Sequence, residues 1–217
     1  MKKKQQSSYY PVCLNISGKK CVVFGGGQVA WRKVRVLLKH GAKVEIISPT
    51  LCLELVQLAD SGGIKVLRRT YVGGDLTGAF VAIAATDDSE INLKIAEEAR
   101  RKVILVNVVD DVVKSDFILP SFVRRGDITI AVSTAGKSPA LARKIRTILE
   151  NVFGDEYASL ALLIDEVRAE IKSQGIKVSG DAWQEALDLD LLVETVRKGD
   201  SEKARAILFS NLEGLQE

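Results

Sequence analysis

The residues best suited to chemistry lie where short apolar runs end. Gly25-Gly26-Gly27-Gln28-Val29-Ala30 follows the run Cys21–Phe24 and matches the pattern G-x-G-x-x-A between a strand and a helix. In that pattern the first glycine permits a tight turn, the second lets the backbone approach a pyrophosphate, and the small last residue lets helix and strand pack. The N–H groups at the start of the helix favour anionic phosphates. We therefore predict a dinucleotide site with contacts at Gly25, Gly27, Gln28, Val29 and Ala30, the alternative being a purely structural turn.

The end of the second expected strand lacks the acid that usually holds the ribose of NAD. Ser48 stands there, followed by Pro49 and Thr50. No arginine follows that would bind the 2′-phosphate of NADP. We expect backbone groups of Pro49 and Thr50, or the Ser48 hydroxyl, to hold the ribose, so the residues favour NAD over NADP only modestly.

A second polar loop, Thr86-Asp87-Asp88, follows the apolar run Phe80–Ala84. Ligands of parallel sheets bind outside the carboxyl ends of the strands. We therefore predict Thr86 and Asp87 as cofactor contacts. Capping of the next helix is an equal alternative for Asp87 and Asp88.

A third polar group closes the run Val103–Val109. Asn107 is predicted to contact the cofactor, and Asp110 has no evident helix to cap. The single histidine, His40, ends a predicted helix, where it interacts with the helix dipole. This excludes a histidine-centred triad and a multi-histidine metal site, and we predict no metal ligands. Proton transfer then falls to a carboxylate, lysine or tyrosine, and Asp110 is the predicted general base.

The segment from Asp116 to Glu150 is rich in basic residues. It carries six of them against three acids: Arg124, Arg125, Lys137, Arg143, Lys144 and Arg146. The segment is either a solvated helix face or a cluster that receives several substrate carboxylates. Thr134 lies in a turn before a helix, where it could bind a substrate carboxylate, or the turn could simply serve capping by Ser138. We predict Arg124, Thr134 and Lys137 as substrate contacts.

Strands and helices alternate along the first half of the chain, which predicts an α/β fold with a Rossmann-like parallel sheet covered on both faces. Strands are expected at 21–24, 44–47, 64–67 (an edge strand), 80–84 and 103–109, and helices at 28–40, 50–61 (capped by Thr50) and 89–101. A two-stranded antiparallel piece is expected at 117–123 and 128–133, then a helix at 138–152 opened by Pro139. Residues 155–212 are predicted helical, with Asp181 and Asp200 as N-caps.

The composition further limits the classes of function that the chain can have. The chain has 217 residues, 47% of them apolar and 27% charged, with a net charge of +3. That charge is too small for a nucleic-acid binder but suits a polyanionic small molecule. The run Ala79–Ala85 is far shorter than the roughly 20 residues of a membrane helix, and residues 1–8 lack the apolar stretch of a signal peptide. We expect a cytoplasmic protein with no nucleic-acid or membrane partner, and with Cys13, Cys21 and Cys52 as buried, reduced thiols.

Taken together, the motifs resemble those of one family. They are Tyr10-Pro11-Val12, the glycine turn with Arg32-Lys33, Ala84–Asp88, Asn107–Asp110 and Ser133–Pro139. This set is similar to precorrin-2 dehydrogenase, the dehydrogenase and ferrochelatase module of siroheme synthase. The resemblance covers about residues 9–150, and the helical remainder matches only in general character.

The resemblance implies NAD-dependent oxidation of precorrin-2 to sirohydrochlorin, a tetrapyrrole of siroheme or cobalamin synthesis. It places the catalytic aspartate at Asp110 and NAD contacts at Gln28-Val29 and Pro49-Thr50. It also implies a Rossmann domain (1–114), a small α+β dimerisation module (115–152) and an all-helical domain (153–217), in a homodimer. In bifunctional members the same pocket inserts ferrous iron, and whether this chain accepts ferrous or cobalt ion stays open.

Two other functions remain as alternatives. The first is an NAD-binding regulatory or sensor domain without catalysis, which would need neither Asp110 nor a basic cavity. The second is a dehydrogenase that acts on some other small polyanion.

Overall fold

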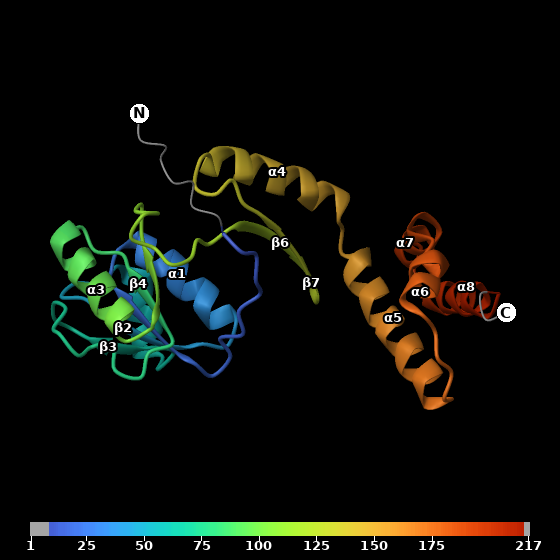
Figure 1. Ribbon diagram of the computed structural model, residues 1–217, viewed down its shortest axis with the longest axis horizontal. Coiled ribbons are helices and arrows are strands. Elements are labelled where there is room, and N and C mark those ends of the chain that lie inside the picture. The colour runs from blue at the N-terminus through green and yellow to red at the C-terminus, as the bar shows by residue number, and fades with distance from the viewer. Residues whose placement is uncertain (1–8, 215–217) are drawn as a thin grey trace. The chain divides into compact units, whose positions relative to one another are not determined.

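A computed structural model describes residues 9–214 as two compact units that divide between Leu119 and Pro120 (Figure 1). The predicted polar tail at residues 1–8 lies outside the described residues. The division falls five residues after the predicted boundary at 114.

The first unit is built on a parallel sheet of five strands in the order β3-β2-β1-β4-β5. The strands are β1 (Lys20–Phe24), β2 (Lys43–Ile47), β3 (Lys65–Leu67), β4 (Val81–Ala84) and β5 (Leu105–Val108). All four pairings are parallel, so every strand ends at the same edge. The predicted edge position of the third strand is confirmed.

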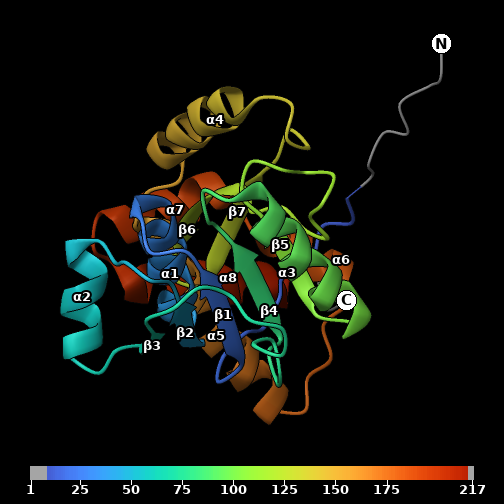
Figure 2. The ribbon, with the colours of Figure 1, turned by 90° about the vertical axis from the view of Figure 1, so that its left-hand side faces the viewer.

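Alternate residues of β1 enter two different cores. Cys21 and Val23 pack with α1 (Gln28–Lys39) and α2 (Leu53–Asp60), whereas Val22 and Phe24 pack with α3 (Ser89–Arg101). Because successive strand residues point to opposite faces, the helices cover both faces of the sheet, as Figure 2 shows. The doubly covered sheet predicted from the sequence is confirmed.

Two predicted boundaries in this unit are wrong. Thr50 does not cap α2, which begins at Leu53 with Cys52 as its N-cap. Cys52 donates its backbone N–H to Gly26 O at 2.7 Å, which ties the residue before α2 to the glycine turn. The fifth strand begins at Leu105 rather than Val103, because Val103 adopts a left-handed backbone with φ of 56°.

The second unit begins with an antiparallel pair, β6 (Ser121–Arg125) and β7 (Ile128–Val132), against which α4 (Pro139–Val152) packs. The pair and the proline-opened helix were predicted. The first strand starts four residues later than expected, because Phe117 O accepts a hydrogen bond from Asn107 Nδ2 of β5 and so belongs to the first unit.

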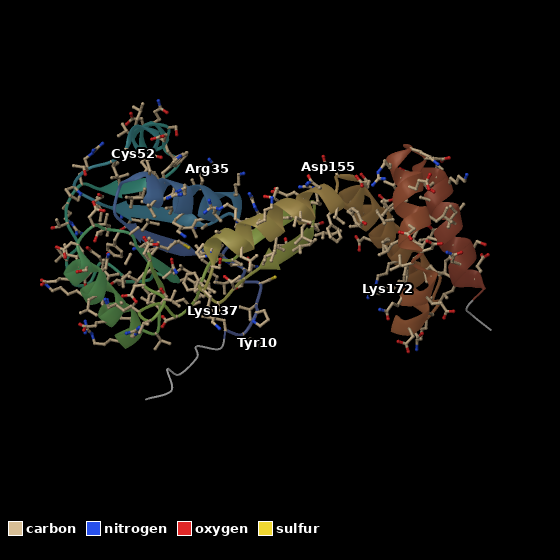
Figure 3. The ribbon with its side chains drawn as sticks, turned by 90° about the horizontal axis from the view of Figure 1, so that it is seen from above. Tyr10, Arg35, Cys52, Lys137, Asp155 and Lys172 are labelled. Atoms are coloured by element: carbon tan, nitrogen blue, oxygen red, sulfur yellow. The ribbon has the colours of Figure 1, made fainter. Side chains whose placement is uncertain are left out.

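Four helices complete the second unit: α5 (Glu156–Ser173), α6 (Gly180–Ala186), α7 (Leu189–Arg197) and α8 (Ser201–Glu213). Asp155 precedes α5 and Lys172 lies near its end, as labelled in Figure 3. The predicted cap at Asp200 is confirmed, but Asp181 is not a cap, because the Ser179 hydroxyl accepts the N–H of Ala182 in its place. No helix among residues 9–214 is long and apolar enough to cross a membrane.

Candidate active site

The turn between β1 and α1 contains three glycines, of which the first two are constrained by neighbouring backbone atoms. Gly25 has φ of 107°, and a Cβ there would lie 2.2 Å from Ala85 O. A Cβ on Gly26 would lie 1.9 Å from Thr50 O. Gly25 and Gly26 are therefore required by the packing of neighbouring strand ends.

Gly27 differs because neither its backbone conformation nor its neighbours among residues 9–214 require a glycine. Its φ is −84°, which any residue adopts, and a Cβ there would meet no atom within 4 Å. A side chain at this position would project into open space directly before a helix. The open space is what a bound pyrophosphate needs, so the turn fits a dinucleotide.

The N-terminus of α1 carries no side-chain cap. Gly27 is the N-cap and makes no capping hydrogen bond, and the first turn holds no acid. The N–H groups of the first turn of a helix have no partner within the helix. They are therefore available to phosphate oxygens, with Gln28, Val29 and Ala30 at the predicted contact positions.

The end of β2 is closed by its own hydrogen bonds. Ser48 is buried and its hydroxyl donates to Thr50 O at 2.7 Å. Pro49 and Thr50 are exposed beside it. The predicted ribose contacts thus lie at the mouth of the strand next to the glycine turn, but the Ser48 hydroxyl already has an acceptor.

One acid beside the turn was missed by the sequence reasoning. Gln28 Nε2 donates to both carboxylate oxygens of Glu54, at 3.0 and 2.9 Å. Glu54 lies in the first turn of α2, six residues beyond Ser48. The hydrogen bond from Gln28 is the main reason that the pKa of Glu54 is lowered. The sequence would have indicated Glu54 only if the start of α2 had been predicted correctly.

The junction between β4 and α3 is satisfied internally. The Asp88 carboxylate accepts the N–H groups of Glu90 and Ile91 at 2.8 and 3.1 Å and caps α3. The Thr86 hydroxyl lies 2.8 Å from Asn92 Oδ1. Asp87 is exposed. Capping thus falls to Asp88, while cofactor contacts at Thr86 and Asp87 stay predictions.

Asp110 follows β5 in a strained turn. Its φ is 60°, a left-handed conformation that is uncommon outside glycine and is tolerated best by Asn and Asp. Among the described residues, its exposed carboxylate makes no hydrogen bond or ion pair. The next residue, Asp111, pairs with Lys114 at 2.9 Å. Of two adjacent acids, one holds the turn and the other is free to react.

A lysine of α1, Lys33, interacts electrostatically with this carboxylate. Burial lowers the pKa of Lys33, the neighbouring Arg32 lowers it further, and Asp110 raises it. In the sequence, Lys33 stands out only as part of the motif Arg32-Lys33. Asn107, the remaining predicted cofactor contact, is buried and uses its amide to hold Phe117 O at 3.0 Å.

The predicted substrate contacts belong to the second unit. Arg124 Nε donates to Gly126 O at 2.9 Å, and Thr134 Oγ1 accepts the N–H of Ser138 at 3.0 Å. Lys137 is exposed (Figure 3). Ser138 caps α4 through the N–H of Leu141, so the capping alternative is confirmed for this turn.

No cluster of three or more histidine, cysteine or acidic residues that could hold a metal ion occurs in residues 9–214. All three cysteines are free, but only Cys21 is buried as predicted, since Cys13 is exposed and Cys52 is half-buried. Burial raises the pKa of Cys21 to about 11.

Comparisons with known proteins agree with the motifs. Residues 12–121 match a family described as putative NAD(P)-binding, and residues 125–151 match the central family of sirohaem biosynthesis proteins. The siroheme synthase of Nitrosococcus oceani is 38% identical over 95% of this chain and 44% of its own length. That of Chromobacterium violaceum is 37% identical over 91% and 42%. The chain spans less than half the length of these curated relatives.

The fold also matches a solved structure. The protein described as SirC, precorrin-2 dehydrogenase, superposes with a TM-score of 0.69 at 24% identity, over 95% of this chain and 100% of that one. The likeness shows a shared fold. The match over residues 12–121 is followed by the match to the sirohaem central family at residues 125–151. The chain therefore belongs to the putative NAD(P)-binding family, and siroheme synthases are among its relatives.

Proposed function

We propose that this chain oxidises precorrin-2 to sirohydrochlorin with NAD. The observation that carries the proposal is the pairing, at one edge of one sheet, of an uncapped glycine turn with the unpaired carboxylate of Asp110. The siroheme synthase relatives and the fold shared with a precorrin-2 dehydrogenase support the substrate.

Each of these residues has a separate proposed role. Gly27 and the first turn of α1 hold the diphosphate, Pro49 and Thr50 flank the ribose, and Thr86 and Asn107 line the strand ends beyond. Bound NAD supplies the hydride acceptor. Asp110 accepts the proton that leaves the macrocycle with the hydride, so the reaction yields sirohydrochlorin, NADH and one proton. The exposed basic residues Arg124 and Lys137 suit a substrate that carries eight carboxylates.

An anaerobic assay of the full chain tests the proposal. Mixed with NAD and precorrin-2, the protein should produce NADH absorbance together with the sirohydrochlorin spectrum. Binding of NAD without turnover would favour the sensor function instead, and turnover only with another polyanion would favour the second alternative.

Metal insertion is a second candidate activity, because Asp110 is also free to accept pyrrole protons as an ion enters. Ferrous or cobalt ion would then be a substrate. Adding either ion to sirohydrochlorin and the protein should give the metallated spectrum faster than without protein. An unchanged rate would limit the chain to oxidation.

A homodimer is supported by the surface of α4. Leu141, Ile148 and Val152 are 52%, 53% and 55% exposed, and with the half-buried Ile145 they recur at helical spacing along one stripe. A second copy of this chain would cover such a stripe. Ile148→Glu should give a monomer in light scattering, whereas Asn151→Glu, a charge on the same helix, should not. A monomeric wild type would contradict the dimer.

A further inference from the structure

Glu54 is fixed beside the glycine turn by its neighbour on α1. Gln28 follows Gly27 directly and donates its side-chain amide to Glu54 Oε1 and Oε2 at 3.0 and 2.9 Å. Cys52, just before α2, is tied to Gly26 through its backbone N–H at 2.7 Å. Two separate links, one of side chains and one of backbone, therefore bring the first turn of α2 against the turn that precedes α1.

The Glu54 carboxylate is an uncompensated negative charge. Its hydrogen bond from Gln28, and its own backbone N–H, lower its pKa, so the carboxylate stays ionised. No lysine or arginine pairs with it within residues 9–214. Glu45 of β2, by contrast, lies 3.6 Å from Lys20 Nζ and 2.9 Å from Lys65 Nζ. The charge of Glu45 is neutralised and that of Glu54 is not.

The usual place for a ribose acid is filled by a neutral group. Ser48 ends β2, is 5% exposed, and donates its hydroxyl to Thr50 O. Dinucleotide sites of this fold recognise the ribose with an acid at that strand end. Here the acid nearest in sequence beyond β2 is Glu54, which the start of α2 carries to the same edge.

We propose that Glu54 recognises the adenosine ribose and makes this site select NAD over NADP. The inference rests on the dinucleotide binding of the proposed function. An ionised carboxylate accepts hydrogen bonds from ribose hydroxyls and repels a 2′-phosphate. Gln28 holds the carboxylate in place, so selection against NADP comes from a fixed charge rather than from a missing arginine alone.

Glu54→Gln tests the inference, because glutamine keeps an amide partner for Gln28 and removes the charge. NADH and NADPH are titrated separately into the full chain, and binding is followed by nucleotide fluorescence. The wild type should prefer NADH. The variant should bind NADH more weakly and NADPH more tightly, which shifts the ratio of the two affinities by about tenfold or more.

Asp60→Asn is the matched control, since it removes one negative charge from the opposite end of the same helix. Its affinity ratio should equal that of the wild type. Salt provides a second test that needs no substitution. The preference of the wild type for NADH over NADPH should shrink between about 0.01 and 1 M salt, because the Debye length falls from about 30 to 3 Å.

Failure of the proposed function and failure of the role of Glu54 would give different binding results. A wild type that binds neither nucleotide would overturn the proposed function and this inference together. A wild type that prefers NADH, with the same ratio in Glu54→Gln or no salt dependence, would overturn the role of Glu54 alone. Circular dichroism confirms that each variant is folded.

Discussion

Two strands that lie side by side, β1 and β4, both turn into helices at the same edge of the sheet, but the two helices begin differently. α3 opens on Asp88, whose carboxylate takes the N–H groups of Glu90 and Ile91. α1 opens on Gly27, which caps nothing. The same edge thus carries one N-terminus closed by the protein and one left open.

The difference between the two N-termini indicates which helix can bind an anion and which has a structural role. An Asp, Asn or Ser cap stabilises a helix by only a few tenths of a kcal/mol more than a glycine cap does, and α1 forgoes that small stabilisation. An acid at the same position would fill the space that phosphates need and repel them. The absent cap of α1 is therefore the feature that permits an anionic ligand, and the Asp88 cap makes α3 a helix of the scaffold.

The largest effect is expected from Gly26→Ala. The new Cβ would lie 1.9 Å from Thr50 O and 2.8 Å from Leu51 Cδ2, so the loop between β2 and α2 would have to move. We expect a loss of about 3 kcal/mol in the free energy of unfolding. Thermal denaturation measures it. Gly27→Ala, which meets no atom, should lose about 1 kcal/mol or less, and equal losses in the two variants would remove the distinction between these glycines.

Asp110→Asn extends the comparison to the end of β5. Asparagine tolerates the left-handed backbone at φ of 60°, so the fold should remain, but the proposed proton acceptor is lost. The rate of precorrin-2 oxidation should fall about 10²- to 10⁴-fold, with NADH affinity nearly unchanged. Asp111→Asn is the control and should stay active, because it removes the charge that pairs with Lys114 but keeps an acceptor for the Lys114 N–H. An active Asp110→Asn would end its catalytic role.

Tyr71→Phe tests whether α3 is purely structural. Tyr71 OH donates to the buried carboxylate of Glu98 at 2.5 Å, which Lys102 Nζ and Gly74 N–H also approach. Removing one donor should cost about 1–3 kcal/mol of stability without changing NADH affinity.

The pH dependence of this loss has a defined sign. Burial is the largest influence and raises the pKa of Glu98, but the hydrogen bonds from Lys102, Tyr71 and Gly74 together lower it. Stabilisation by a lowered carboxyl pKa is present above the ordinary value of 4.5 and is lost as the pH falls through the folded value. The difference between wild type and Tyr71→Phe should therefore shrink below that pH in urea denaturation, and a difference that grows would contradict the network.

Asp88→Ala should have the smallest effect. It removes the cap of α3 and should lower stability by about 1 kcal/mol, measured by urea denaturation. NADH affinity should stay close to that of the wild type. A large loss of affinity would show that the second junction also takes part in binding.

The glycine turn, the strands and the free Asp110 could be predicted because each is a local pattern. What could not be predicted depends on contacts between distant segments. The true start of α2 is set by the bond from Cys52 to Gly26, and Glu54 reaches the site only because α2 starts there. The apolar sequence around Phe117 predicts a strand that begins there. Instead, a hydrogen bond from the side chain of Asn107 to Phe117 O ties this residue to the sheet of the first unit.

Gly27→Asp tests the central claim most directly, because it gives α1 the kind of cap that α3 has. Aspartate fits the extended backbone and the open space at this position and is a preferred N-cap. We expect the melting temperature to stay the same or rise, while NADH affinity in a fluorescence titration falls by about 100-fold or more. A folded Gly27→Asp protein that binds NADH as the wild type does would contradict the assignment of this turn to the cofactor.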